Sequence, residues 1–185
     1  MTSWLERSLA ALGAWLLKAD LGLGLLLLVG LSFSLSHAFA LLANRLTPRQ
    51  ILLRLLLDAL VLTLVLLLSG ILDMLLLAVL AQRPVQPTAF VNRMGAALIP
   101  GLFYILVAAP YISDLIALAI WFLVHLNVVT LLHVGFALPW TQALALSTPG
   151  FGVALALVAL LFRQSWQASY RQLAGAVDAE RPLTG

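Results

Sequence analysis

The longest apolar stretch of the chain decides its fold class, and it reads PRQILLRLLLDALVLTLVLLLSGILDMLLLAVLA from Pro48 to Ala81. Thr47 precedes it and suits an N-cap, while Pro48 suits the first helical position and Gln50 completes a capping box. From there we expect a helix over residues 51–81, which is longer than the roughly 20 residues that a bilayer crossing needs. We therefore expect this helix to tilt, or to leave its first turns at the membrane interface.

The composition of the whole chain agrees with a membrane environment. Of its 185 residues, 63% are hydrophobic and only 9% are charged, and the mean hydropathy is +1.10. A soluble domain carries about 25% charged residues, so that class is excluded. Cysteine is absent, which excludes disulfides and thiolate chemistry. The basic residues stand singly at the ends of apolar runs, which is typical of membrane-span flanks and argues against a nucleic-acid surface.

Working outward from residues 51–81, similar apolar runs predict an all-α, polytopic transmembrane helical bundle with four or five spans over residues 20–173. The predicted spans are residues 21–43, 51–81, 89–109, 115–137 and 149–170. Pro100 and Gly101 predict a kink in the third span.

The last span is the one on which the count depends, because its purely apolar run, residues 151–162, is short for a crossing. Thr148 and Pro149 resemble an N-cap and a first helical position. The helix then either extends past Arg163 towards Tyr170, or it borrows residues 139–147 as a re-entrant piece.

The two ends of the chain differ from the bundle. Residues 1–19 place apolar side chains on one face, which predicts an amphipathic helix lying in the headgroup plane; packing against the bundle is the alternative. Residues 174–185 are expected to form a polar tail. The positive charges that flank the spans are nearly balanced between the two sides, so they do not predict the orientation.

Ionisable residues inside the spans are the informative candidates, because a charge at membrane depth is costly unless it is paired or solvated. Arg54 and Asp58 are one helical turn apart, so they are expected to pair either as an interfacial salt bridge or as part of a gate. Asp73 lies deeper, about 60° around the axis from Asp58, so both acids face roughly the same side of the helix. That side is expected to be the bundle interior.

The histidines complete a candidate intramembrane polar network, whose members are His37, Arg54, Asp58, Asp73, His125 and His133. Depth along the helices pairs His37 with Asp58 and His133 with Asp73. His37 and His125 differ by about 6 Å in depth, which is a poor fit to a haem held by two histidines. Either each histidine bonds a backbone carbonyl or water, or together with the acids they form a path for protons or substrate.

A stripe of small residues at four-residue spacing, Ser32, Ser36 and Ala40, is a candidate helix-packing surface on the first span. Small residues let helices approach closely, either within one chain or between chains. The sequence contains no motif of a soluble enzyme, so no catalytic, cofactor-binding or metal-binding residue is predicted.

The segment from Phe90 to Leu146, FVNRMGAALIPGLFYIL followed by LIALAIWFLVHLNVVTLLHVGFALPWTQALAL, resembles the bacterial branch of the Yip1-like membrane proteins. The likeness lies in a Gly/Ala-then-Pro third span and in a fourth span that ends in a Gly-aromatic-small turn. It implies a non-enzymatic membrane protein that acts through protein partners or on membrane organisation. The Asp-Leu-Tyr-Gly-Pro-like motif of eukaryotic members is absent, so the resemblance does not extend to their Rab-binding role.

Two functions follow as expectations. The first is a non-enzymatic scaffold or accessory subunit that uses helix–helix contacts with other membrane-protein subunits or with itself. The alternative is a small transporter or channel-like protein that uses the buried Asp and His residues. In both cases we expect an integral protein of the bacterial inner membrane, surrounded by the lipid bilayer, with no cofactor and no nucleic-acid partner.

Overall fold

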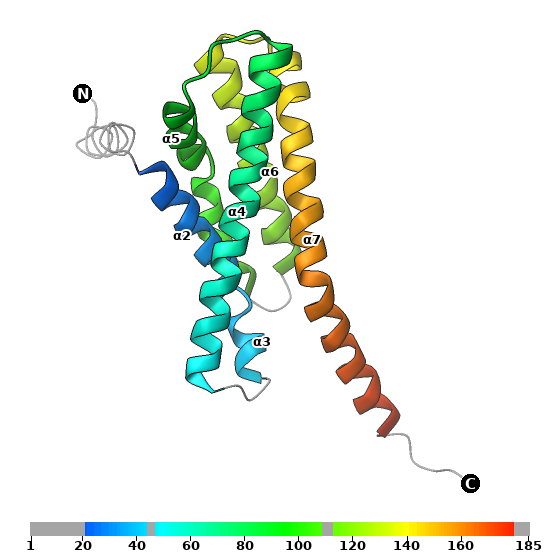
Figure 1. The fold of residues 1–185 in the computed structure, drawn as a ribbon. Helices are drawn as coiled ribbons and strands as arrows, with labels where there is room; N and C mark the ends of the chain where they lie inside the picture. Colours follow the sequence, from blue (N-terminus) through cyan, green and yellow to red (C-terminus); the bar gives the residue numbers. More distant parts are fainter. Residues whose placement is uncertain (1–20, 44–46, 109–112, 180–185) are drawn as a thin grey trace, which may run out of the picture.

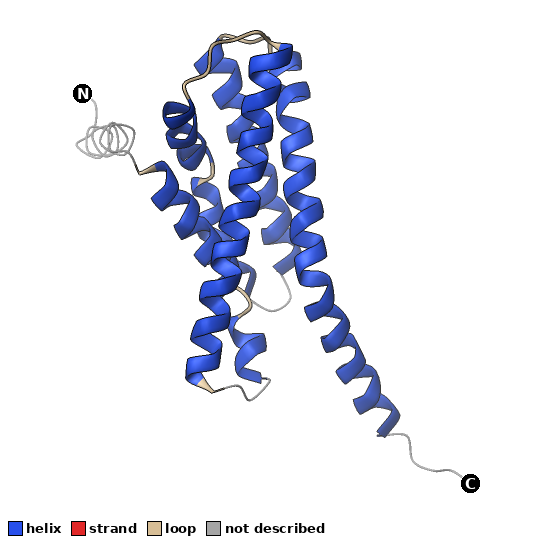
Figure 2. Cartoon of the chain, in the orientation of Figure 1, coloured by secondary structure: helices blue, strands red, loops and turns tan. Residues whose placement is uncertain are grey.

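The computed structural model describes residues 21–43, 47–108 and 113–179, and within them the fold is an all-α bundle without a strand (Figures 1 and 2). The predicted fold class is therefore confirmed. The helices are α2 (Gly22–Leu35), α3 (Ala38–Ala43), α4 (Pro48–Leu80), α5 (Pro87–Ala97), the 3-10 helix η1 (Ile99–Ala108), α6 (Ser113–Phe136) and α7 (Trp140–Ala179). The amphipathic helix predicted at residues 1–19 lies outside the described residues.

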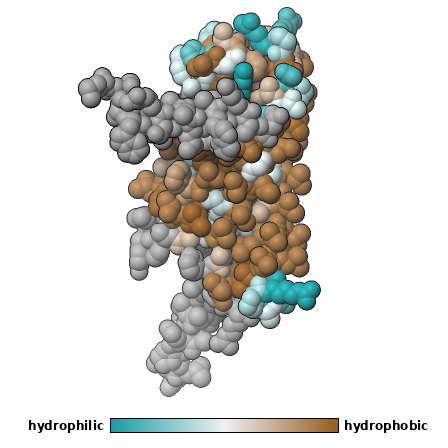
Figure 3. Space-filling model, turned by 90° about the vertical axis from the view of Figure 1, so that its left-hand side faces the viewer, coloured by the Kyte–Doolittle hydropathy of each residue, from teal (hydrophilic) through white to brown (hydrophobic). Residues whose placement is uncertain are grey.

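Within the described residues, four helical segments are long and apolar enough to cross a membrane. They are Pro48–Leu80, Pro87–Ala108, Ser113–Phe136 and Trp140–Leu161. Leucines such as Leu64 and Leu118 are exposed on the outer faces of these helices. Figure 3 shows apolar atoms over the middle of one face, with polar atoms at its top and bottom. A bilayer covers a surface of this kind, so the chain is an integral membrane protein.

The start of α4 follows the sequence closely. The Thr47 hydroxyl accepts a hydrogen bond from the Gln50 N–H at 3.4 Å, and the Gln50 side chain accepts one from the Thr47 N–H at 2.9 Å. Pro48 lies in the first turn of the helix. An N–H group there would have no acceptor within the helix, so the absence of one in proline costs no hydrogen bond. The predicted capping box is confirmed, and α4 packs against both α2 and α7.

The segment predicted as one span over residues 21–43 is instead divided into α2 and α3. The Ser36 hydroxyl donates to the Phe33 carbonyl at 2.7 Å, and the His37 N–H donates to the Ser34 carbonyl at 3.1 Å. Such local bonds compete with the helical pattern and turn the chain at Ser36 and His37. The 14 residues of α2 measure about 21 Å, which is shorter than a crossing.

The third span changes its helix type at the predicted kink. Helix α5 ends at Ala97 and η1 continues for 10 residues around Pro100, which has no N–H to donate. A 3-10 helix of this length is uncommon. Ser32 of α2 supports it, because its hydroxyl donates to the Leu102 carbonyl at 2.7 Å and accepts from the Ile105 N–H at 3.0 Å.

Helix α7 differs from the span predicted at residues 149–170, because it begins at Trp140 and contains Pro149 in its interior. Thr148 is therefore not an N-cap, and its hydroxyl donates to the Leu144 carbonyl at 2.7 Å. The part from Trp140 to Leu161 has 22 residues and is long enough to cross. The helix continues to Ala179, into the segment predicted as a polar tail, and residues 180–185 lie outside the described part of the chain.

Small residues bring the backbones of the bundle together. A Cβ atom at Gly95 of α5 would lie 2.6 Å from the Gly22 carbonyl oxygen of α2, and one at Gly30 would lie 2.6 Å from the Ala59 carbonyl oxygen of α4. The packing stripe is also used inside the chain, since Ser32 bonds η1 and Ser36 bonds its own turn. The side chain of Ala40 lies outside the described residues.

Candidate functional site

A buried carboxyl group from α4 lies inside the bundle. Asp73 is only 2% exposed, and its Oδ1 atom has no hydrogen-bond partner. The buried Nδ1 atom of His125 on α6 also lacks a partner. Among the buried side-chain nitrogen and oxygen atoms of the described residues, these two are the ones left unsatisfied. Most buried polar atoms find a partner because leaving one without a hydrogen bond is costly, so this coincidence requires an explanation.

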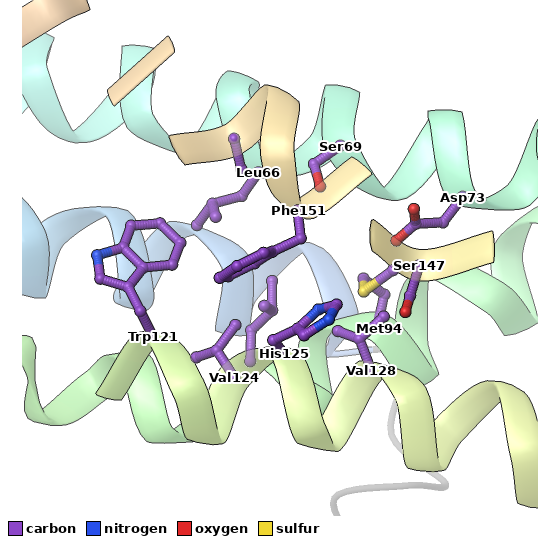
Figure 4. A pocket seen from close by; sticks show the side chains of 12 residues that line it. Leu66, Ser69, Asp73, Met94, Trp121, Val124, His125, Val128, Ser147 and Phe151 are labelled. Carbon is purple, nitrogen blue, oxygen red and sulfur yellow. The ribbon is translucent and has the colours of Figure 1, made fainter. Parts of the chain in front are cut away.

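Both atoms belong to residues that line one small cavity between α4, α6 and α7 (Figure 4). Figure 4 places Asp73 and Ser147 at one end of it, Trp121 at the other end, and His125 between them beside Phe151. The cavity offers about 20 Å³ to the centres of water-sized molecules, which is enough for at least one water. It is lined by Leu66, Ser69, Asp73, Met94, Leu98, Trp121, Val124, His125, Val128, Ser147, Phe151 and Ala154.

A glycine of α7 makes room for the carboxyl group. A Cβ atom at Gly150 would collide with Oδ1 of Asp73 and would lie 2.8 Å from the Ser69 carbonyl oxygen. Oδ1 of Asp73 nevertheless has no hydrogen-bond partner. The close approach of α7 to α4 at this glycine therefore encloses the carboxyl group without giving Oδ1 a hydrogen bond.

Aromatic rings form the wall of the cavity away from Asp73. The His125 ring stacks on Phe151 with centroids 4.3 Å apart, and Phe151 meets Trp121 edge-on at 5.8 Å. Trp121 in turn contacts Phe33, which stacks on Tyr104 at 3.7 Å. These rings come from α2, η1, α6 and α7, so they fix the imidazole and exclude water from one side of the cavity.

The histidine pairing expected from depth differs from the one in the structure. His133 does not line the Asp73 cavity; its Nδ1 lies 2.6 Å from the Leu138 carbonyl oxygen, and its ring stacks on Trp140. His133 thus closes the turn between α6 and α7, as one of the two interpretations of the histidines expects. His125 takes the place beside the Asp73 cavity, because the packing of α6 against α7 turns its ring there.

The remaining candidates form a separate group near the start of α4. His37 bonds its own turn, with Nδ1 3.2 Å from the Phe33 carbonyl oxygen. Asp58 is half-buried and lies one helical turn after Arg54. No ion pair at contact distance joins Arg54 to Asp58 in the described part of the chain. The predicted network is therefore divided into Asp73 with His125, a second group at the start of α4, and His133 at the α6–α7 turn, and in the described residues only the first contains unsatisfied buried atoms.

The α7 half of the site is not predicted by the sequence patterns. The Thr148–Pro149 signal places Ser147 before a helix and Gly150 in its first turn, and Ser69 is not among the predicted site residues. Ser69 stands four residues before Asp73, so helical spacing alone could have placed both on one face.

The described residues contain no group of three or more His, Cys, Asp or Glu side chains that could hold a metal ion. No protein-family model, curated protein or solved structure matches the chain.

Proposed function

We propose that this protein is a small, non-enzymatic membrane transport protein, or the ion-binding subunit of one, in which Asp73 and His125 take up and release a proton. The observation that carries the proposal is that the two unsatisfied buried atoms belong to residues of different helices, and that both residues line the same cavity. An ionisable group in a span is expensive, and it is retained where a bound ion or proton satisfies it. A purely structural role would leave both atoms hydrogen-bonded within the bundle.

The chemistry of the lining favours a proton over a metal cation. A hard cation is bound by about six oxygen ligands, whereas this cavity offers one carboxylate and the hydroxyls of Ser69 and Ser147. An imidazole exchanges protons near neutral pH. A water molecule in the cavity would connect the carboxylate to the imidazole, and the space of about 20 Å³ accommodates it.

The scaffold or accessory-subunit function gains less support. It would be favoured by a small-residue surface free for a partner, yet Gly22, Gly30 and Ser32 are used in contacts inside the chain. It stays a prediction, as does association with other subunits or self-association. We also retain the Yip1-like relationship and a bacterial inner-membrane location as proposals that rest on the sequence resemblance.

The test is proton uptake by liposomes that contain the purified protein and an internal pH-sensitive dye, driven by a potassium diffusion potential. We expect protein-dependent acidification that falls at least tenfold in Asp73→Asn and in His125→Gln. Asp114→Asn is the matched control, because Asp114 is an exposed carboxylate in the first turn of α6. It is expected to behave as the unsubstituted protein.

A second measurement covers the case in which transport needs a further substrate. Infrared difference spectra between acidic and alkaline pH detect protonated carboxyl groups directly. Asp73→Asn should remove one such band, which Asp114→Asn should retain. If Asp73→Asn leaves both the spectrum and the acidification unchanged, the proton-binding function is wrong.

A further inference from the structure

A groove runs between α5 and α6 on a part of the molecule distinct from the Asp73 cavity. Its outer part, of about 430 Å³, lies where the α4–α5 connection meets the α6–α7 turn and includes Arg83, Gln86 and Arg93. Its inner part, of about 640 Å³, includes Ala96, Ala97, Leu131 and again Arg93. Arg93, Val134 and Gly135 line both parts, so the two form one continuous groove.

The positive charge of this groove is not neutralised within the described part of the chain. Arg83 and Arg93 are both exposed, and neither forms an ion pair with a described residue. Of the described acidic side chains, Asp58 and Asp114 lie towards the opposite ends of α4 and α6, and Asp73 is buried in its own cavity. An arginine that lies within a span, as Arg93 does, is costly without a counter-charge.

Gly135 lets α6 accept the guanidinium group of Arg93. A Cβ atom at Gly135 would lie 3.3 Å from Nη1 of Arg93, so the guanidinium rests against the backbone of the last turn of α6. Arginine binds phosphate oxygens through two parallel N–H donors, and a basic groove between spans is typical of anionic lipid headgroup sites. The inner part then continues along α5 and α6, the direction that an acyl chain would follow. Most of its lining beyond Arg93 is small or apolar, and Asn127 and Thr130 are its polar members.

We propose that this groove binds an anionic phospholipid, with the phosphate held by Arg83 and Arg93 and an acyl chain lying along α5 and α6. The proposal rests on the charge and shape of the groove alone and is independent of the proton site. Asn127 limits the inner end, since its amide donates to the Ala97 carbonyl oxygen at 3.1 Å and ties α6 to α5.

Native mass spectrometry of the full chain with added phosphatidylglycerol or phosphatidylcholine tests the proposal. We expect phosphatidylglycerol to bind at least fivefold more tightly than phosphatidylcholine, and Arg93→Gln to remove most of this preference. Arg49→Gln is the matched control, because Arg49 is an exposed arginine in the first turn of α4, away from the groove. Its lipid preference should equal that of the unsubstituted chain.

A second variant and a competition experiment complete the test. If Arg93→Gln does not fold, Arg83→Gln in the connecting segment should still lower the preference at least twofold. Inorganic phosphate at equal concentration should not displace the lipid; full displacement would mean a free-anion site and would overturn the proposal. Equal losses in Arg93→Gln and Arg49→Gln would overturn it as well. Lipid binding that appears only in the double variant Glu6→Gln, Asp20→Asn would also overturn the proposal. That result would mean that these two acids neutralise the arginines in the unsubstituted chain.

Discussion

Gly150 is the residue that allows Asp73 to lie in the interior, and its replacement is a direct test of that contact. The Cβ atom of Gly150→Ala would meet both the Asp73 carboxyl group and the Ser69 carbonyl oxygen, and a backbone oxygen in a helix moves only if the helix moves. We expect α7 to shift from α4, with a loss of about 1–3 kcal/mol in the free energy of unfolding. Thermal unfolding in detergent, followed by circular dichroism, measures it.

Gly152→Ala provides the matched control for this prediction. Gly152 lies on the same helix and is exposed, and a Cβ atom added there would have no heavy atom within 4 Å outside its own stretch of helix. Alanine there should leave stability unchanged or raise it by up to about 1 kcal/mol, because alanine favours the helix. Equal unfolding temperatures for the two variants would show that the Asp73–Gly150 contact is not close.

For single residues, the sequence predicts which polar side chains are buried in the spans better than it predicts which residues they lie beside. Asp73 stands out because a carboxylate in an apolar span is costly, and the structure buries it as expected. Its association with His125 rather than His133 could not be predicted from depth alone, because a comparison of depths treats the helices as upright rods and ignores rotation about their axes. Which way a ring faces depends on packing against α7, and α7 starts earlier than its local signals indicate.

The 3-10 helix η1 depends on a side chain from another element. Ser32 both donates to η1 and accepts from it, so Ser32→Ala removes two bonds and leaves the Ile105 N–H without this acceptor. Hydrogen bonds between membrane helices contribute about 0.6 kcal/mol each on average, and an unsatisfied N–H adds to the loss. We expect Ser32→Ala to lower the free energy of unfolding by about 1–2 kcal/mol in a detergent unfolding titration.

Ser36→Ala is the comparison for Ser32→Ala, since the Ser36 hydroxyl bonds the Phe33 carbonyl within its own turn. Its effect should be smaller, about 0.5 kcal/mol, because the bonds of this hydroxyl, to the Phe33 carbonyl and to Nδ1 of His37 at 3.0 Å, lie within one turn. A Ser32→Ala loss no larger than that of Ser36→Ala would indicate that η1 does not depend on its bonds to Ser32 of α2.

Elements with strong local signals could be predicted, and elements shaped by competing signals could not. Helix α4 begins at its capping box and extends through the apolar run that defines it. The Thr148–Pro149 pair resembles a helix start of the same kind, but the chain is already helical from Trp140, and neighbouring hydroxyls bond the Leu144 carbonyl around the proline. The carbonyl that Pro149 leaves without a helical N–H donor is that of Ala145, so these hydroxyl bonds fall one residue before it, and the helix nevertheless continues through the proline.

For the whole molecule, the four candidate spans fix which connections share a side of the membrane. Helices α4 and α6 run in one direction and α5–η1 and α7 in the other, so the start of α5 and the start of α7 lie at the same end of the bundle (Figure 1). The starts of α4 and α6 lie at the opposite end. This arrangement of ends follows from the order of the helices and does not depend on the orientation of the protein.

The absence of cysteine makes the arrangement measurable, because single cysteines can be introduced without removing any native one. We expect Gln86→Cys and Thr141→Cys to react with a membrane-impermeant maleimide from one side of sealed vesicles, and Arg49→Cys and Asp114→Cys from the other. All four positions are exposed at helix starts. Labelling of Gln86→Cys and Arg49→Cys from the same side would mean that α4 does not cross the bilayer. The same data also give the orientation, which the sequence leaves open because the positive charges that flank the spans are nearly balanced between the two sides.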